Sequence, residues 1–249
     1  MAEKNEGEEN MRLKIECVLD NNIIFTDYRR KILSFFKKSL QVYCEEIKEK
    51  YYDSFHEKDM TFSCYLPIEK IENDKFYLKG TTFKIFISFD SIIDGIHFYN
   101  AFVTAKKKNL KFKFDENNFK IKNINKLPEK DIKEDIAIFK TLSPIVIREQ
   151  IEKEGEKKEW FHLLDEKGIE ILKKNMCYSL REKFTLGELE ALEIKPIEVR
   201  KTVVNFYKIK FPATNGKLVI KGDKKILNYL YRTGLGGKCP SGFGMLELL

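Results

Sequence analysis

The chain has 249 residues, of which 43% are hydrophobic, 13% aromatic and 34% charged. This composition is typical of a globular protein and argues against a disordered chain. No apolar run reaches the roughly 18 residues of a membrane-spanning helix, and the polar start shows no secretory signal. The five cysteines are scattered and form no C-x-x-C pair. They argue against a disulfide scaffold or a zinc knuckle, so we expect a cytoplasmic protein.

The charge is distributed unevenly along the chain. The net charge is +7, and the first ten residues contain four glutamates and one lysine, which leaves +10 on the remainder. A basic body with an acidic extension is typical of a protein whose body binds a polyanion. Solubility and the codon bias of an AT-rich genome explain surplus lysine equally well, so the charge alone does not decide between these explanations.

The first elements in chain order are a strand and one or two helices. The strand starts at Met11, because apolar residues then occupy every second position. A helix is predicted over 28–40, with Asp27 as its cap and one apolar stripe at every fourth residue. A second stripe of the same spacing extends the helical pattern, continuous or broken near Gln41, to about His56.

Two strands, a helix and another strand complete the first half. A short strand is predicted over 61–67, and the run 75–90 forms a further strand with a bend or hairpin at Gly80. The next helix begins at Asp90 and Ser91, and its predicted apolar side carries Ile92, Ile93, Ile96 and Val103. Alternation over 112–124 indicates the last strand. The order β, α, β, β, α, β is that of a ferredoxin-like unit.

The second half repeats this order after a polar stretch that contains a proline. The elements expected there are a strand at 142–149, a helix with apolar residues from Ile169 to Leu180, strands at 192–199, 203–211 and 217–222, a helix at 224–234 and a final strand. The predicted fold class is α+β, with two tandem ferredoxin-like (RRM-like, βαββαβ) domains and a C-terminal glycine-rich loop. The domains are then a disordered acidic extension at 1–10, a first domain at 11–126, a linker at 127–140 and a second domain at 141–249.

The C-terminal loop is the sharpest local motif. Five of the 13 glycines fall within the eleven residues from Gly234 to Gly244, between a predicted helix and the last strand. Glycine permits positive φ angles, and successive N–H groups in such a loop can form an anion-binding concavity, with Lys238 inside it. The other interpretation is a tight helix-to-strand connection with close packing, and the spacing alone leaves both open. The loop is not a Walker motif, since no G-K-[ST] follows a strand.

The sequence GLGGKCPSGFGMLELL at 234–249 resembles the glycine-rich signature of the CRISPR-associated repeat-processing endoribonucleases of the RAMP superfamily. Other segments agree in order along the chain. MRLKIE at 11–16 resembles the opening strand of this family, DYRRKILSFFKKSL at 27–40 resembles its first helix, and TLSPIVI at 141–147 resembles the start of its second domain. The resemblance therefore covers residues 11–249.

Members of this family cleave the repeat RNA of CRISPR precursor transcripts without a metal. The ribose 2′-OH attacks the adjacent phosphate, which leaves a 2′,3′-cyclic phosphate and a free 5′-OH. This chemistry needs proton transfer and positive charge around the phosphate. The family commonly places a histidine after the first helix, and FHEKDMTFS puts His56 at that position. A preceding helix C-terminus and Asp53 would favour its imidazolium form, which can donate a proton.

The other two histidines have simpler interpretations. His97 is expected to be a half-buried residue of the helix that begins at Ser91. His162 is expected to open the helix of the second domain. Without the resemblance, His56 itself reads as an exposed loop residue.

The chain departs from the family at two positions. Many members carry a tyrosine near the end of the first helix, where Lys37 stands in this chain, and Tyr43 is the nearest tyrosine downstream. The lysine that many members place about six residues after the histidine has only Lys58 as a counterpart. A lysine suits a phosphate oxygen but is a weak base at its ordinary pKa. We therefore expect His56 to transfer protons and Lys37 or Lys58 to stabilise charge, although each lysine also reads as a solvated side chain.

Further RNA contacts are predicted in three places. The resemblance implies an RNA-binding role for the C-terminal loop through Gly234, Gly236, Gly237, Lys238, Ser241, Gly242 and Gly244. Arg200 and Lys201, between two expected strands, are further candidates. The run KKKNLKFKF at 106–114 combines lysines with Phe112 and Phe114, as RNA-binding segments do, but strand spacing favours core phenylalanines with solvated lysines.

The resemblance thus implies an endoribonuclease that uses no metal and no cofactor, and its expected partner is CRISPR repeat RNA. No metal-binding motif is present in the sequence. Other Cas proteins and a second copy of the chain are further partners that the sequence leaves open, and no membrane is expected. One alternative is a RAMP-type subunit that binds repeat RNA without cleaving it. Another is a regulatory or small-molecule-binding ferredoxin-like protein with no affinity for RNA.

Overall fold

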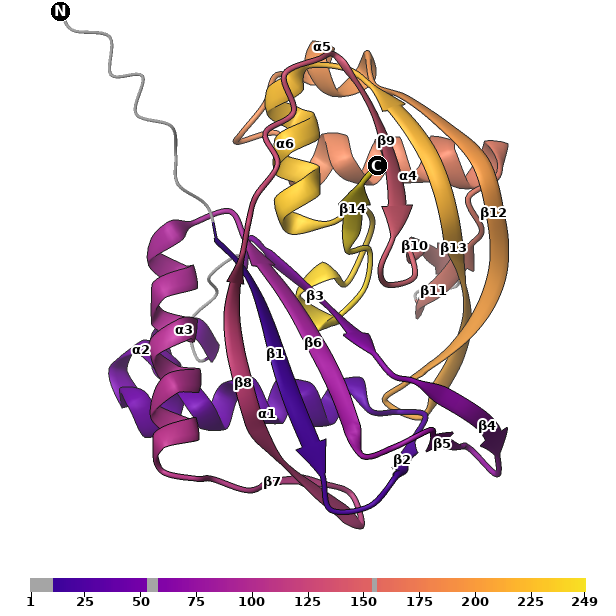
Figure 1. The fold of residues 1–249 in the computed structure, drawn as a ribbon. Helices are drawn as coiled ribbons and strands as arrows, with labels where there is room; N and C mark the ends of the chain where they lie inside the picture. The colour runs from indigo at the N-terminus through magenta and orange to yellow at the C-terminus, as the bar shows by residue number, and fades with distance from the viewer. Residues whose placement is uncertain (1–10, 53–57, 154–155) are drawn as a thin grey trace, which may run out of the picture.

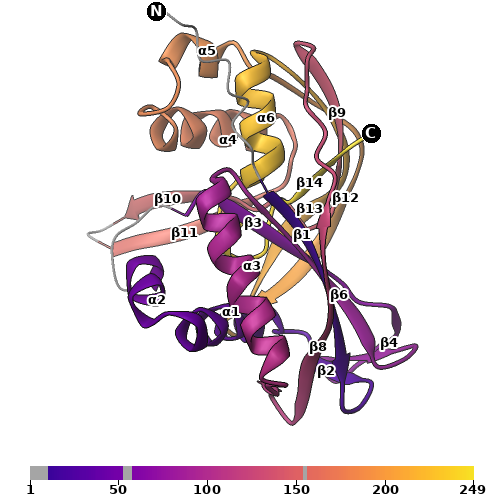
Figure 2. The same cartoon turned by 60° about the vertical axis from the view of Figure 1, so that its left-hand side comes forward.

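The computed structural model of the chain describes residues 11–52, 58–153 and 156–249. The predicted acidic extension 1–10 and the predicted catalytic residue His56 lie outside the described residues. The chain forms two successive units, each with its own sheet and helices (Figure 1). Figure 2 shows the helices of both units on one side of the molecule and the two main sheets on the other.

The first unit is built on a five-stranded antiparallel sheet in the order β3-β6-β1-β8-β7. Its main elements follow as β1, α1, β3, β6, α3 and β8, which is the ferredoxin-like order. A small sheet, in the order β2-β5-β4, is added beside it. The bounds are β1 Met11–Leu19, β2 Ile23–Phe25, α1 Arg29–Tyr43, α2 Glu45–Tyr52, β3 Met60–Tyr65, β4 Ile68–Glu72, β5 Lys75–Leu78, β6 Thr82–Phe89, α3 Ile92–Lys107, β7 Phe112–Phe114 and β8 Asn117–Leu127.

Phenylalanines fill the core of this unit. Phe35 and Phe36 of α1 pack against Phe98 and Phe102 of α3, with ring centroids between 5.2 and 5.8 Å apart for the inter-helix pairs. One pair is stacked, one is tilted and one is edge-to-face, and offset stacking and edge-to-face packing are favourable arrangements for aromatic rings. The stripe predicted on the first helix is correct, because its residues at every fourth position are buried. Phe112 and Phe114 are buried as well, which confirms the core interpretation of the run at 106–114.

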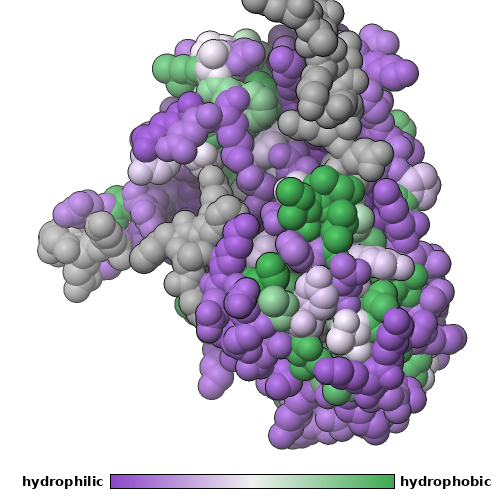
Figure 3. All heavy atoms as spheres, turned by 90° about the vertical axis from the view of Figure 1, so that its left-hand side faces the viewer, coloured by the Kyte–Doolittle hydropathy of each residue, from purple (hydrophilic) through white to green (hydrophobic). Residues whose placement is uncertain are grey.

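The apolar side predicted for α3 is wrong. Ile93 is 61% exposed and Ile96 43% exposed, while Phe98, Ala101 and Phe102 on the other side are buried. Both sides of this helix are apolar, and the side with the two phenylalanines buries more surface, so it faces the sheet. Figure 3 shows hydrophobic residues gathered on the side of the molecule where α3 lies.

The second unit has a four-stranded antiparallel sheet in the order β12-β13-β9-β14. Its elements again follow the ferredoxin-like order, with a hairpin inserted after the first strand, so the predicted tandem fold is confirmed. The bounds are β9 Ile136–Thr141, β10 Ile147–Lys153, β11 Glu156–His162, α4 Glu166–Ser179, α5 Leu186–Glu190, β12 Glu193–Phe206, β13 Ile209–Lys221, α6 Lys224–Thr233, a 3₁₀ helix at Cys239–Ser241 and β14 Leu246–Leu248.

The first strand of this unit lies earlier than predicted. β9 begins within the stretch 127–140, which was predicted to be a linker, and the predicted strand 142–149 instead leads into the inserted β10–β11 hairpin. Exposed isoleucines alternate with buried Ala137 and Phe139 along β9, but charged neighbours hid this short pattern. His162 ends β11 and does not open a helix, since α4 begins after Asp165, whose side chain accepts the N–H of Gly168.

β12 and β13 form one long hairpin, so the predicted strand break around Arg200 and Lys201 is wrong. Its turn is made by Tyr207 and Lys208, both with positive φ, and their N–H groups donate to the carboxylate of Asp27 at 3.2 Å. Asp27 was predicted to cap α1. It does not do so, because its oxygens bind this turn and Arg30. The first unit thereby stabilises a strained turn of the second.

A small shared core joins the two units. Phe243, from the glycine-rich loop, packs with Phe206 and Phe211 of the long hairpin, and Phe161 stacks on Phe211 at 4.2 Å. Leu33 of α1 packs against the same cluster. The loop between α6 and β14 therefore sits at the junction of the two units.

Candidate functional site

Two of the predicted catalytic residues meet over one aromatic ring. The Nζ atom of Lys58 lies 4.3 Å from the ring centroid of Tyr52, and the Nζ atom of Lys37 lies 5.7 Å from the same centroid. Lys37 is on α1, Tyr52 ends α2, and Lys58 precedes β3. The two lysines were predicted as alternatives, whereas the structure brings both together. His56, two residues before Lys58 in the chain, lies outside the described residues.

The electrostatics of this cluster favour an anion. Burial, and then the charge of Lys37, lowers the pKa of Lys58 below its ordinary value. Two ammonium groups that repel each other are stabilised by a negative group placed between them. Burial also raises the pKa of Tyr52, so that its hydroxyl keeps its proton at neutral pH. A phosphodiester is an anion that would suit this arrangement.

Sequence reasoning missed Tyr52. It pointed to Tyr43 as the nearest substitute for the absent tyrosine, but the Tyr43 hydroxyl accepts a hydrogen bond from Asn100 at 3.5 Å and its ring lies beside His97. Tyr51 is a buried core residue against Phe98. The place of Tyr52 in the sequence, four positions before His56, was the available signal.

The second unit fixes the chain directly after Lys58. The carboxylate of Asp59 accepts a hydrogen bond from the Tyr229 hydroxyl of α6 at 2.6 Å, and it forms an ion pair with the Nζ atom of Lys183 at 2.6 Å. Charge-assisted contacts of this length are strong. The main-chain position of Lys58 therefore depends on both units.

Three glycines of the C-terminal loop serve close packing. Gly234, Gly242 and Gly244 are buried and have positive φ angles. A Cβ on Gly242 would lie 2.6 Å from the ring of Phe62, and one on Gly244 would lie 2.1 Å from the carbonyl oxygen of Leu235. Buried Arg29 donates from Nε to the Gly242 carbonyl at 3.0 Å. These positions match the packing interpretation of the loop.

The outer part of the loop is half-buried and carries the charge. Lys238 has a φ of 62°, and its Nζ lies 4.0 Å from Glu159 of β11. The same carboxylate pairs with Arg148 at 2.9 Å. The N–H of Gly237 donates to the Val146 carbonyl and is not free to bind an anion. A polyanion at this part of the loop would therefore contact its charged side chains. Arg148 was not predicted as a contact, because the sequence shows there only a basic residue after an apolar run.

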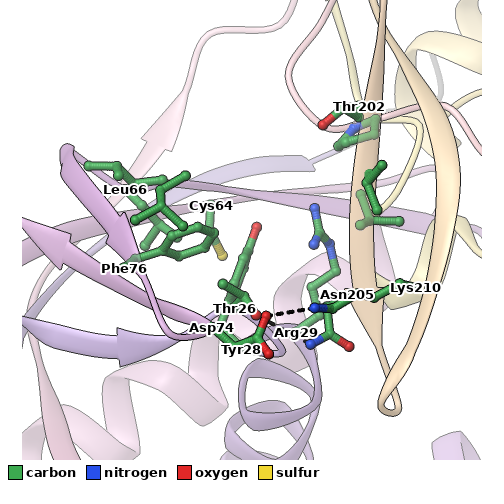
Figure 4. Close-up of a pocket in the computed structure, with 15 residues that line it drawn as sticks. Thr26, Tyr28, Arg29, Cys64, Leu66, Asp74, Phe76, Thr202, Asn205 and Lys210 are labelled. Carbon is green, nitrogen blue, oxygen red and sulfur yellow. Dashed lines mark hydrogen bonds and ion pairs between the residues drawn. The ribbon is translucent and has the colours of Figure 1, made fainter.

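Arg200 and Lys201 are exposed on β12 of the second unit. Arg200 lines a pocket of about 580 Å³ together with Lys140 and Lys217. Residues 202–205, which follow Lys201, line a second pocket. Along β12, Arg200 therefore lines one cavity, and the other cavity begins at Thr202, directly after Lys201 (Figure 4).

The remaining histidines have partners or places away from these groups. His162 makes a 2.9 Å contact with Glu149 across the β10–β11 hairpin. His97 is half-buried on α3, as predicted. Within residues 11–52, 58–153 and 156–249, no three His, Cys, Asp or Glu side chains gather into a group that could bind a metal. None of the helices in the described part of the chain has the length and hydropathy that crossing a bilayer requires.

Two tandem ferredoxin-like units, with a glycine-rich loop packed at their junction, define a fold of the RAMP class. Solved structures agree with this class: a Cas6-related protein of Pyrococcus furiosus has a TM-score of 0.81 at 24% identity, over 97% of this chain and 99% of its own. A RAMP protein described as binding different RNA substrates has a TM-score of 0.80 at 23% identity, over 96% and 99%. At these identities the likeness shows the fold.

Residues 125–248 match the family model described as CRISPR associated protein Cas6, C-terminal. The chain belongs to the Cas6 family. It is 33% identical over 163 residues to the CRISPR-associated endoribonuclease-like protein Cas6 of P. furiosus, which is 64% of each chain. It is 30% identical over 154 residues to the endoribonuclease-like protein Cas6nc of Pyrococcus horikoshii, over 60% of this chain and 63% of that protein. The matched region thus spans less than two thirds of either relative.

Proposed function

We propose that the protein is a metal-independent endoribonuclease that cleaves CRISPR precursor transcripts within the repeat. The 2′-OH of a ribose loses its proton to water as it attacks the adjacent phosphorus, and the bond from phosphorus to the 5′ oxygen breaks. The products are a guide RNA with a 2′,3′-cyclic phosphate and a fragment with a free 5′-OH. His56 donates a proton to the leaving oxygen, and Lys37 and Lys58 stabilise the charge that develops on the phosphate.

The observation that supports this proposal is the pair of ammonium groups over Tyr52. Lys58 is half-buried, and it is separated from His56 by a single residue of the chain. A partly desolvated ammonium group such as that of Lys58 interacts with a phosphorane-like transition state more strongly than a solvated lysine would. Membership of the Cas6 family and the name of the P. furiosus relative agree with this chemistry.

The repeat RNA would contact a wider surface than the cleavage site. In this proposal Lys238, with Gly236, Gly237 and Ser241 around it, binds phosphates at the outer part of the loop. Arg200 and Lys201 bind phosphates along β12. Gly234, Gly242 and Gly244 act by holding the loop in its shape, since their surroundings leave no room for a side chain.

The second candidate is a RAMP-type subunit that binds repeat RNA within an effector complex without cleaving it. Lys37 stands where many family members carry a tyrosine, and this difference favours the second candidate. It predicts tight, salt-dependent RNA binding and intact RNA.

One experiment separates the two candidates. The protein is incubated in EDTA with the repeat RNA encoded beside its gene, and with the same RNA carrying a single 2′-deoxyribose at the cleavage position. We expect the first RNA to be cut to a cyclic-phosphate product and the second to stay intact, because the attacking hydroxyl is missing. Cleavage that needs Mg²⁺, or that survives the 2′-deoxy substitution, would contradict the proposed mechanism.

The shared environment of the two lysines gives a second prediction. The charge of Lys37 is one of the two causes that lower the pKa of Lys58, so Lys37→Met is expected to raise the Lys58 pKa toward its ordinary value. NMR titration of ¹³C-labelled lysine side chains measures this midpoint directly. Lys38→Met, on the exposed side of α1, is the matched control and should leave the midpoint unchanged. An unchanged midpoint in Lys37→Met would mean that the two ammonium groups do not act on one site.

A further inference from the structure

Asp59 is the middle residue of a tight turn that contains Lys58. The N–H of Met60 donates to the Lys58 carbonyl at 2.8 Å, which closes a three-residue turn around Asp59. The Asp59 carbonyl accepts the N–H of Asp90, the residue after β6, at 3.0 Å. Met60 is buried at the start of β3. A shift of Asp59 therefore displaces Lys58 as well.

The side chains of these two neighbours contact different units. The Nζ atom of Lys58 lies over the ring of Tyr52 in the first unit. The carboxylate of Asp59 contacts the second unit, where Oδ1 accepts from the Tyr229 hydroxyl and Oδ2 pairs with the Nζ atom of Lys183, both at 2.6 Å. We call these two contacts the Asp59 bridge. Because each carboxylate oxygen has its own partner, the bridge fixes both the position and the orientation of the Asp59 side chain.

The second unit holds both partners of Asp59 in place. The buried ring of Tyr229 packs edge-to-face on Phe184, with centroids 5.5 Å apart, and the Nζ atom of Lys183 lies 5.4 Å from the Tyr229 centroid. The N–H groups of Lys183 and Phe184 both donate to the Leu180 carbonyl, at 2.9 and 3.0 Å. A hydrogen-bonded turn after α4 therefore presents Lys183, and a packed helix presents Tyr229. Such supported side chains can position a neighbouring group precisely.

A second contact of α6 supports the same turn. Arg232 follows Tyr229 by three residues, so both side chains lie on one face of the helix. The Nη1 atom of Arg232 lies 3.4 Å from Oδ1 of Asp90, whose N–H donates to the Asp59 carbonyl. α6 thus contacts the end of the first sheet where β3 begins and β6 ends (Figure 1). The location of the turn is set by a helix of the other unit.

We propose that Asp59 is a positioning residue for the cleavage reaction, and that the Asp59 bridge holds Lys58 beside Lys37 over the ring of Tyr52. The inference rests on the proposed function in one respect, namely that the two lysines stabilise the phosphate during cleavage. Asp59 acts through the main-chain position of Lys58 and takes no part in the chemistry. The lysine pair is then assembled only when the second unit is docked on the first. A displacement of about 1 Å can slow a catalysed reaction by roughly 10²-fold, so such control has a large effect.

The first test measures the position of Lys58 without RNA. Tyr229→Phe removes one hydroxyl, changes no charge and keeps the ring that packs on Phe184. Burial and the charge of Lys37 lower the pKa of Lys58, so a Lys58 released from this site should titrate at a higher pH. NMR titration of ¹³C-labelled lysine side chains measures the midpoint. Tyr178→Phe, at an exposed tyrosine of α4, is the matched control and should leave the midpoint unchanged.

The second test measures cleavage. Lys183→Met breaks the ion pair, whereas Lys183→Arg keeps a cation at the same place. We expect Tyr229→Phe and Lys183→Met to cut repeat RNA about tenfold more slowly in single-turnover reactions, with unchanged RNA affinity, because Lys58 is misplaced while RNA-binding groups remain. Lys183→Arg should cut at close to the original rate. An equal loss in Lys183→Arg and Lys183→Met would overturn the role of the ion pair.

The two tests separate the bridge from the nuclease activity. An unchanged Lys58 midpoint in both Tyr229→Phe and Lys183→Met would overturn the proposal, and so would a slower cleavage that weaker RNA binding fully explains. The titration contains no RNA. A raised midpoint in a protein that leaves repeat RNA intact would therefore support the bridge and contradict only the proposed function.

Discussion

A His56→Ala variant is expected to cut repeat RNA about 10²- to 10⁴-fold more slowly than the unmodified protein, with nearly unchanged RNA affinity. The reason is that the leaving 5′ oxygen loses its proton donor, while the lysine pair and the basic strand β12 remain. The loss should be measured as a single-turnover cleavage rate with saturating protein, and the affinity should be measured separately by filter binding. The two readouts distinguish a chemical role from a binding role.

The chain provides two controls for this result. His97→Ala changes a half-buried side chain of α3, and His162→Ala removes a contact with Glu149 in the β10–β11 hairpin. Both variants should cleave at close to the original rate. Cleavage that survives in His56→Ala, or an equal loss in His97→Ala, would assign the chemistry to other groups.

A Gly242→Ala variant is expected to destabilise the whole protein by about 1–3 kcal/mol. Gly242 has a φ of 90°, and an added Cβ would lie 2.6 Å from the ring of Phe62. The substitution therefore combines a strained backbone with a clash, and it displaces the carbonyl that accepts from Arg29. The free energy of unfolding in urea, measured by circular dichroism, checks this prediction.

Gly80→Ala is the matched control for the glycine substitution. A Cβ at Gly80 would meet no atom within 4 Å, and its φ lies outside the positive range. We expect its free energy of unfolding to stay within about 0.5 kcal/mol of the original value. If Gly242→Ala were as stable as Gly80→Ala, the close packing of the loop at the junction of the two units would not contribute to the stability of the protein.

Much of the fold was predictable from the sequence because its regular elements follow simple periods. The strand that starts at Met11 has a buried apolar residue at every second position, and α1 repeats its apolar residues every four positions. The sequence could not decide which of two apolar sides of α3 faces the sheet, since that depends on the area each side buries. It also could not show that Asp27 binds a turn 180 residues away, where the hydrogen bonds are long-range.

The candidate site was predictable in part. Lys37 and Lys58 were selected by resemblance, and their meeting over Tyr52 depends on how α2 folds back on α1. The cavity that Arg29 and residues 202–205 line was not foreseen, because its residues come from two units and form no motif in sequence. Such a cavity follows from the way the sheets are assembled, which local periodicity does not encode.

The cluster around Phe243 has a consequence for how this chain unfolds. Since Leu33 and Arg29 of the first half pack against its aromatic rings, which come from the second half, separating the halves would expose that surface to water. We therefore expect a single cooperative melting transition, in which neither half persists after the other has melted. The two halves should behave as one thermodynamic body despite their repeated architecture.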